Sequence, residues 1–106
     1  MSKEYRVIIE PEAIAGIESG YEWIRGSSPD RATAWVNGLL DAIQSLNKMP
    51  ARCTLALENE YFSEEIRQLF YGKRGRVYRI LFTIREDEVH VIFVRHSAQA
   101  PLSESE

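Results

Sequence analysis

Residues 66–96 read IRQLFYGKRGRVYRILFTIREDEVHVIFVRH. This run is rich in β-branched and aromatic residues, and the turn-forming sequence GKRG interrupts it. A second short link, Glu86-Asp87, divides the remainder. The composition predicts three consecutive strands, at residues 66–71, 77–85 and 88–95. Strands joined by such short links pair as an antiparallel meander, so this part of the chain is expected to form a sheet.

Two amphipathic helices are predicted before the meander, one at residues 11–25 and one from Pro29 to the break at Met49-Pro50. Apolar side chains recur in both at spacings of three and four, which places them on one face. These stripes are Ile14, Ile17, Tyr21 and Ile24 in the first helix and Trp35, Val36, Leu39, Leu40, Ile43 and Leu46 in the second. Because only Gly26 and Ser27 separate the helices, an antiparallel hairpin that packs on the sheet is expected.

Gly16 and Gly20 lie inside the first predicted helix, where glycine weakens helical structure. Each glycine lacks a Cβ, however, and so lets a packed neighbour approach the helix closely. Trp23 and Trp35 lie at core-like helical positions and are interpreted as packing residues.

A short strand at residues 5–10 precedes the helices, which gives the order β-α-α-β-β-β. The predicted fold class is α+β, with an antiparallel helix hairpin packed on one face of a mostly antiparallel four-stranded sheet. The first strand is expected to pair with the last, because the helices carry the chain away from the meander. One domain spans residues 1–97, and residues 98–106 are expected to form a flexible acidic tail.

The chain has 106 residues, which suits one domain, and a formal net charge of −3. No apolar run approaches the ~20 residues that span a membrane, and the N-terminus lacks the apolar core of a signal peptide. The single cysteine, Cys53, cannot form a disulfide within the chain, so a cytoplasmic location is expected. Because the sequence has no Cys/His cluster and no glycine-rich phosphate loop, neither a metal nor another cofactor is expected.

Positive charge is concentrated in the meander. Residues 66–96 carry seven Lys/Arg side chains against three Asp/Glu, whereas the rest of the chain is acidic. Six of the seven are arginine, which favours planar, bidentate contacts to phosphate or carboxylate. A basic segment on an acidic body can still attract phosphates or an acidic protein.

A two-residue link at Glu86-Asp87 would fix the pairing of the last two strands. Ile84 would then face Val89, on the side of the sheet that covers the helices. Further along the same face, Ile80 would face Phe93.

The same register places Arg79 and His96 near each other on the opposite, open face of the sheet. An arginine stabilises charge that develops on a phosphate, and a histidine exchanges protons near neutral pH, so the pair is a candidate phosphate site. The alternative is that both are solvated polar residues on the exposed side of a sheet. Spacing singles out no general base among the nearby carboxylates, which are Glu58, Glu60, Glu64 and Glu65.

Four segments of the meander resemble the RelE/ParE superfamily of small bacterial toxins. They are Ile66-Arg67-Gln68-Leu69, Gly72-Lys73-Arg74-Gly75-Arg76, Tyr78-Arg79-Ile80-Leu81-Phe82 and Val91-Ile92-Phe93-Val94-Arg95-His96. The last is similar to the final strand of these toxins, which often ends in Arg-His followed by a small residue. The resemblance in residues covers about a third of the chain, and the helical half matches in layout and length.

The resemblance implies the toxin of a type II toxin–antitoxin system, with a cognate antitoxin encoded alongside that forms a hetero-oligomer with it. RelE-like members are metal-independent endoribonucleases that cleave mRNA in the ribosomal A site. ParE-like members poison DNA gyrase and are not nucleases. Ribosome-dependent mRNA cleavage is ranked first here and gyrase inhibition second, and a non-toxic binding module that has lost activity is the third alternative. The acidic net charge and Ser97 depart from the usual nuclease pattern.

By position, Arg79 matches the central arginine of the superfamily and Arg67 the basic residue of the preceding strand. His96 or Arg95 falls where nuclease members place a terminal acid or phosphate ligand. Under the nuclease hypothesis, Arg79 binds the scissile phosphate and His96 protonates the leaving 5′ oxygen. The flanking backbone is held by Arg67 together with Lys73 or Arg74. The predicted RNA- or target-binding residues are Tyr71, Lys73, Arg74, Arg76 and Arg95.

Overall fold

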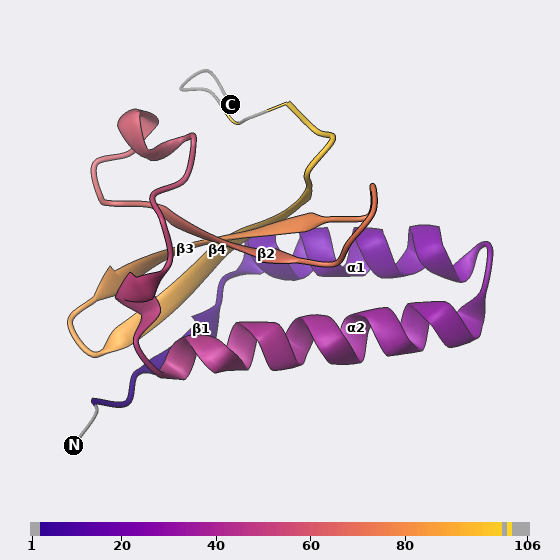
Figure 1. The fold of residues 1–106 in the computed structure, drawn as a ribbon, viewed down its shortest axis with the longest axis horizontal. Coiled ribbons are helices and arrows are strands. Elements are labelled where there is room, and N and C mark those ends of the chain that lie inside the picture. The colour runs from indigo at the N-terminus through magenta and orange to yellow at the C-terminus, as the bar shows by residue number, and fades with distance from the viewer. Residues whose placement is uncertain (1–2, 101, 103–106) are drawn as a thin grey trace.

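The computed structural model describes residues 3–100 and 102. Two antiparallel helices lie along one face of a four-stranded sheet (Figure 1). The helices and strands are β1 Arg6–Ile9, α1 Pro11–Arg25, α2 Pro29–Gln44, β2 Arg67–Tyr71, β3 Tyr78–Arg85 and β4 Glu88–His96. Short 3-10 turns lie between α2 and β2, at Ser45–Asn47, Pro50–Arg52 and Asn59–Tyr61. The α+β fold and the β-α-α-β-β-β order predicted from the sequence are confirmed.

The strands have the spatial order β1-β4-β3-β2. The last three strands form the antiparallel meander, and β1 runs parallel to β4 at one edge. The first strand therefore pairs with the last, as predicted. A parallel pair needs a long connection, and the stretch from α1 to β3 supplies it.

Local sequence sets the start of both helices. Pro11 and Pro29 occupy their first turns, where the fixed backbone angle of proline suits a helix and its missing N–H is not needed. The Ser28 side chain caps α2, because its Oγ accepts a hydrogen bond from the backbone N–H of Arg31 at 3.2 Å.

The main core lies between the helix hairpin and the sheet. Its fully buried strand residues are Ile80, Phe82, Val89 and Val91, and its buried helical residues include Ile17, Leu39, Ile43 and Leu46. Ile14 and Leu40, which the helical pattern assigned to the same stripes, are exposed. The stripes are therefore narrower than the sequence pattern indicated.

The predicted close approach at Gly16 is confirmed. A methyl group at this position would collide with the backbone carbonyl oxygen of Val94, so α1 packs directly against the backbone of β4. At Gly20 the neighbour is the ring of Trp35, which a methyl carbon would approach to 2.7 Å.

The other face of the sheet is not open, contrary to expectation. Leu81 packs there with Ala56, Ile66 and Leu102 in a second, smaller core. The segment before β2 pairs with the sheet edge, because the backbone N–H of Ala56 donates to the Ile66 carbonyl at 2.7 Å. This segment has no hydrophobic period, so the sequence pattern predicts neither a helix nor a strand there.

Leu102 is only 8% exposed, which corrects the expected flexible tail at this residue. Its side chain belongs to the second core, and its backbone N–H is bonded to a buried carboxylate described below. Residues 101 and 103–106, which include the acidic end of the predicted tail, lie outside the described residues.

The pairing of β3 with β4 follows the predicted register only near their turn. Ile84 faces Val89, as the two-residue link implies. Between Leu81 and Phe82 the register then shifts by one residue, and Ile80 faces Val94 rather than Phe93. Such a β-bulge turns every side chain beyond it on the longer strand to the other face of the sheet.

The bulge decides where His96 lies. His96 pairs with Tyr78, whose side chain belongs to the main core, and so lies on the helix side of the sheet. Arg79 points to the opposite face. The predicted neighbourhood of Arg79 and His96 is therefore wrong, and the cause is the one-residue shift.

Candidate functional site

Arg79 is 4% exposed and lies on the outer face of β3, beneath the segment that covers the sheet. Its guanidinium makes a bidentate contact with Glu58, with Nη1 donating to Oε2 at 2.9 Å and Nη2 to Oε1 at 2.6 Å. Oε1 of Gln68 accepts further bonds from Nε at 3.2 Å and Nη2 at 3.0 Å. The open position predicted for Arg79 is wrong, since its charge is neutralised inside the protein.

Glu58 is the fully buried partner, at 0% exposed. Besides Arg79 it binds the tail, because its Oε2 accepts a hydrogen bond from the Leu102 backbone N–H at 3.1 Å. Burial alone would raise the pKa of Glu58, but the hydrogen bonds from Arg79 and Leu102 and the charge of Arg79 outweigh it and lower the pKa below its ordinary value. Glu58 is therefore a carboxylate at neutral pH and the counter-ion of Arg79.

We expect this lowered pKa of Glu58 to make folding pH-dependent. A carboxyl whose pKa is lower in the folded state stabilises the fold above its unfolded pKa, about 4.3 for a glutamate, and this contribution is lost as the pH falls below that value. Urea unfolding between about pH 6 and pH 3 measures this effect. The free energy of unfolding should fall with pH in the natural chain and fall less steeply in Glu58→Gln. An equal fall in the two proteins would mean that the pKa of Glu58 is not lowered by folding.

Arg67 lies at the edge of the sheet, on the helix side, because it pairs with Phe82. Its Nη1 donates to the carbonyl oxygens of Cys53 at 2.6 Å and Ala51 at 3.3 Å. Its Nη2 is 3.3 Å from Glu65. Arg67 thus links the segment after α2 to β2 through hydrogen bonds, and none of these bonds involves Arg79.

His96 ends β4 with its ring edge-on to Tyr78, the ring centroids being 5.0 Å apart. Its Nδ1 accepts a hydrogen bond from the Ala98 backbone N–H at 2.9 Å. The ring orientation is therefore fixed by the turn that follows the strand. Arg67, Arg79 and His96, the three predicted catalytic residues, lie in three separate places.

The predicted target-binding residues divide into two groups. Lys73, Arg74 and Arg76 lie in the exposed turn between β2 and β3, and the described residues form no ion pair with them. Tyr71 instead donates from its hydroxyl to the Trp35 carbonyl at 3.1 Å, and Arg95 donates to the Ala100 carbonyl at 2.9 Å. Lys73, Arg74 and Arg76 therefore remain exposed to a partner, whereas Tyr71 and Arg95 are hydrogen-bonded to the backbone of their own chain.

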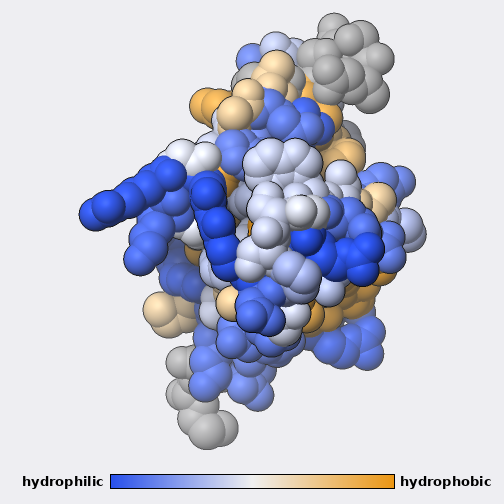
Figure 2. Space-filling model, turned by 90° about the vertical axis from the view of Figure 1, so that its right-hand side faces the viewer, coloured by the Kyte–Doolittle hydropathy of each residue, from blue (hydrophilic) through white to orange (hydrophobic). Residues whose placement is uncertain are grey.

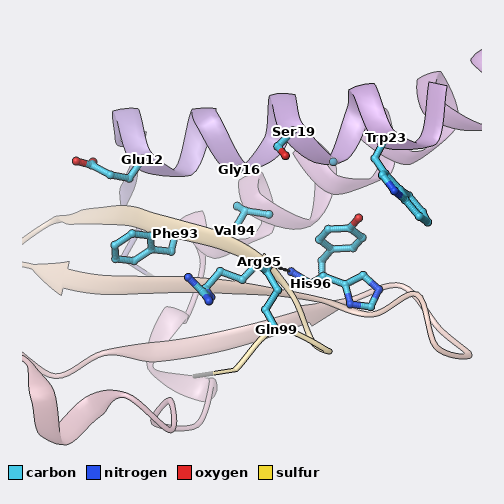
Figure 3. A pocket seen from close by; sticks show the side chains of 11 residues that line it. Glu12, Gly16, Ser19, Trp23, Phe93, Val94, Arg95, His96 and Gln99 are labelled. Carbon is cyan, nitrogen blue, oxygen red and sulfur yellow. Dashed lines mark hydrogen bonds between the residues drawn. The ribbon is translucent and has the colours of Figure 1, made fainter. Parts of the chain in front are cut away.

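Two adjacent hollows lie at the end of the sheet where β3 begins and β4 ends. One, of about 560 Å³, lies between α1 and the end of β4 (Figure 3). The other, of about 360 Å³, lies toward the helix-hairpin loop. Trp23, Tyr78 and His96 line both. Trp23 is 76% exposed, so its interpretation as a core residue is wrong.

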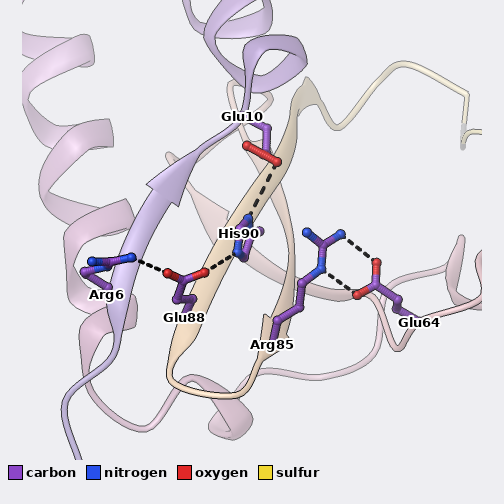
Figure 4. Close-up of polar contacts among 6 residues, drawn as sticks. All are labelled: Arg6, Glu10, Glu64, Arg85, Glu88 and His90. Atoms are coloured by element: carbon purple, nitrogen blue, oxygen red, sulfur yellow. Dashed lines mark hydrogen bonds and ion pairs between the residues drawn. The ribbon is translucent and has the colours of Figure 1, made fainter.

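A separate polar network lies at the other end of the same strands (Figure 4). His90 Nε2 is 2.9 Å from Glu88, and its Nδ1 is 3.6 Å from Glu10. Glu64, one of the four candidate general bases, pairs with Arg85 at 2.7 Å. The hydrogen bond and charge of Arg85 lower the pKa of Glu64. These contacts join the strands to neighbouring segments.

Within residues 3–100 and 102, no helix combines the length and the apolar character needed to cross a membrane. The same part of the chain contains no group of three or more His, Cys, Asp or Glu side chains placed to hold a metal ion.

A family model described as the ParE toxin of the type II toxin–antitoxin system parDE matches residues 7–101. The chain belongs to this ParE toxin family. Among solved structures, a chain from the chromosomal ParDE toxin–antitoxin system of P. aeruginosa is similar with a TM-score of 0.70 and 13% identity. The match covers 88% of this chain and 96% of that one, and at this identity it shows the fold alone. No curated protein sequence matches the chain.

One feature of the sequence of this ParE toxin does indicate a buried ion pair. Arg79 lies in a strand of large apolar residues, and the residues before and after it, Tyr78 and Ile80, are both buried. A charge in such a strand needs a buried partner once both faces of the sheet are covered. Nothing in the spacing separates Glu58 from the other three nearby carboxylates, however, because only the fold brings it to Arg79.

Proposed function

We propose that this ParE toxin arrests growth by binding DNA gyrase and has no nuclease activity. The observation that carries the proposal is the buried ion pair of Arg79 and Glu58. Arg79, the residue that the nuclease hypothesis assigns to the scissile phosphate, can stabilise the charge of a phosphate only if it reaches it, and here it is buried against Glu58. Family membership supports the same choice, because ParE-like members are the gyrase-directed branch of the superfamily that the sequence resembles.

Ribosome-dependent mRNA cleavage, which the sequence ranked first, would need Arg79 and His96 on one surface. They point to opposite faces of the sheet, and Arg67 binds backbone carbonyls of its own chain. Cleavage would therefore require Arg79 to separate from Glu58, and the segment around Ala56 that covers the sheet to move away. Binding to a protein target requires neither change.

The proposal includes a cognate antitoxin, encoded alongside and present in the same cytoplasm. The outer sheet face is already filled by the chain's own segment around Ala56 and by Leu102, so it is not open to the antitoxin. The basic turn at Lys73 and Arg74 stays exposed, and an acidic or amphipathic antitoxin segment that folds on binding suits it.

Induced expression tests the target directly. We expect growth arrest, DNA breaks and a DNA-damage response while mRNA 5′ ends remain unchanged, and we expect the neighbouring antitoxin gene to restore growth. The purified chain should inhibit supercoiling by gyrase. New mRNA ends within translated codons would overturn the proposal in favour of the nuclease. Normal growth at a verified expression level would instead indicate a non-toxic module.

His96→Gln separates the two mechanisms at the level of one residue. The change keeps a polar side chain of similar size but removes the ability to protonate a leaving group. Loss of a general acid lowers a rate by about a hundredfold or more. We expect His96→Gln to inhibit gyrase within about threefold of the natural chain, well short of that general-acid loss. A hundredfold loss of toxicity with the fold intact would contradict the binding mechanism.

A further inference from the structure

The smaller hollow, of about 360 Å³, lies at the helix-hairpin end of the molecule and is not used by the proposed function. Its volume falls within the range of small-molecule sites. Five of its lining residues carry rings: Trp23, Trp35, Tyr71, Tyr78 and His96. Figure 2 looks onto this end of the molecule, where strongly hydrophilic side chains flank a pale area of intermediate hydropathy.

The charge of this hollow has one sign. Arg31 and Arg76 line it, and no acidic side chain does. Both arginines are exposed, and neither forms an ion pair with any residue in the described part of the chain. The positive charge in this hollow attracts anions locally, although the chain as a whole has a net charge of −3. Planar guanidinium groups bind phosphate oxygens through paired hydrogen bonds.

Three of the rings that line the hollow contact one another, and a fourth, Trp23, is exposed. The Trp35 and Tyr78 ring centroids are 4.9 Å apart, and those of Tyr78 and His96 are 5.0 Å apart. Trp23 reaches from α1 toward the sheet beside His96 (Figure 3), and its ring has no aromatic partner among the described residues. An exposed tryptophan next to fixed rings offers a stacking surface for a flat ligand, and nucleic-acid bases bind in this way.

We propose that the hollow binds a nucleotide, with the base stacked at Trp23 and the phosphate held by Arg31 and Arg76. The same chemistry is present in a free mononucleotide and in a nucleotide of single-stranded nucleic acid. The site does not depend on gyrase as the target, and its two chemical requirements, an aromatic surface and an unpaired cation, are both met by named residues.

Calorimetric titration of the full chain tests the ligand class. The probes are AMP, adenosine, which lacks the phosphate, ribose 5-phosphate, which lacks the base, and single-stranded oligothymidylate. We expect saturable one-site binding of AMP and at least about tenfold weaker binding of adenosine and ribose 5-phosphate, because each lacks one contact. Tighter binding of the oligonucleotide than of AMP would support the proposal with a strand as the source, and the reverse order would support it with a free nucleotide.

Matched variants locate the site. Arg76→Gln should weaken AMP binding about tenfold, whereas Lys73→Gln removes the same charge from the same turn, does not line the hollow and should change affinity less than about twofold. Trp23→Leu should also weaken binding about tenfold, and its high exposure means that the fold should tolerate the change.

Three results would overturn the proposal. The first is no saturable binding of either AMP or oligothymidylate at millimolar concentration. The second is binding that Arg76→Gln and Trp23→Leu leave unchanged while circular dichroism confirms the fold. The third is binding of an acidic peptide with no binding of either nucleotide probe, which would make the hollow a protein-docking surface. Failure here would leave the gyrase proposal intact, because supercoiling inhibition is measured separately.

Discussion

Replacing Glu58 with alanine is expected to remove about 3–5 kcal/mol from the free energy of unfolding. The change leaves the Arg79 guanidinium in place, 4% exposed and without its counter-ion. It also removes the acceptor of the Leu102 backbone N–H. Small domains have a total stability of about 5–15 kcal/mol, so a loss of this size leaves a marginal fold.

Urea unfolding followed by far-ultraviolet circular dichroism measures the effect. Glu64→Ala is the matched control, because it breaks an ion pair with Arg85 whose side chains are 40% and 45% exposed. Exposed pairs of this kind contribute about 0–1 kcal/mol. If Glu58→Ala were no more destabilising than Glu64→Ala, the buried pair would not persist in solution.

A double variant separates the pair from its surroundings. Glu58→Leu with Arg79→Leu removes both charges and fills the space with apolar atoms. Replacing a buried pair in this way is often neutral or stabilising, so the double variant should be clearly more stable than Glu58→Ala. If the double variant were as unstable as Glu58→Ala, the fold would depend on the shape and hydrogen bonds of the pair more than on the balance of its charges.

This stability effect changes how toxicity data for Arg79 are interpreted. Arg79→Ala leaves the Glu58 carboxyl buried without its cationic partner, so loss of toxicity would be expected from unfolding alone. An arginine on an open sheet face, as the sequence predicted for Arg79, could have been removed with little change in stability. Only a variant that stays folded, such as the double leucine variant, can report on a direct role of Arg79.

The helix hairpin and the sheet could be predicted because their signals are local. Hydrophobic spacing and caps mark each helix, and alternation with short links marks each strand. The pairing of β1 with β4 then follows from the order of elements, although the parallel direction of that pair was not predicted. These features need no knowledge of which distant residues meet.

The site could not be predicted because two long-range features decide it. The bulge between Leu81 and Phe82 inserts one residue into β4 without a glycine or proline to mark it, yet it moves His96 to the opposite face. The segment that covers Arg79 has no periodicity, and Glu58 lies 21 residues away in the chain. The sequence therefore identified the charged residues as candidates, but it did not predict which residues they contact or on which face of the sheet they lie.

Gly16→Ala is expected to destabilise the fold by about 2 kcal/mol, although alanine favours a helix by about 1 kcal/mol over glycine. The new methyl group would collide with the Val94 carbonyl oxygen, which is a backbone atom of β4. A backbone atom cannot rotate out of the way as a side chain can. α1 must therefore move off the sheet, and the main core beneath it loses contacts.

Gly26→Ala is the matched control, because it adds the same methyl group at the end of the same helix. Gly26 has an ordinary helical φ of −58°, and the nearest atom to its added methyl carbon is the Trp23 carbonyl oxygen at 3.4 Å. We expect Gly26→Ala to unfold at the same urea concentration as the natural chain or slightly higher, since alanine restricts the unfolded chain. If Gly16→Ala were equally stable, α1 would not lie against the backbone of β4. The measured difference between the two variants thus reports the closeness of that contact with the helix propensity of alanine largely cancelled.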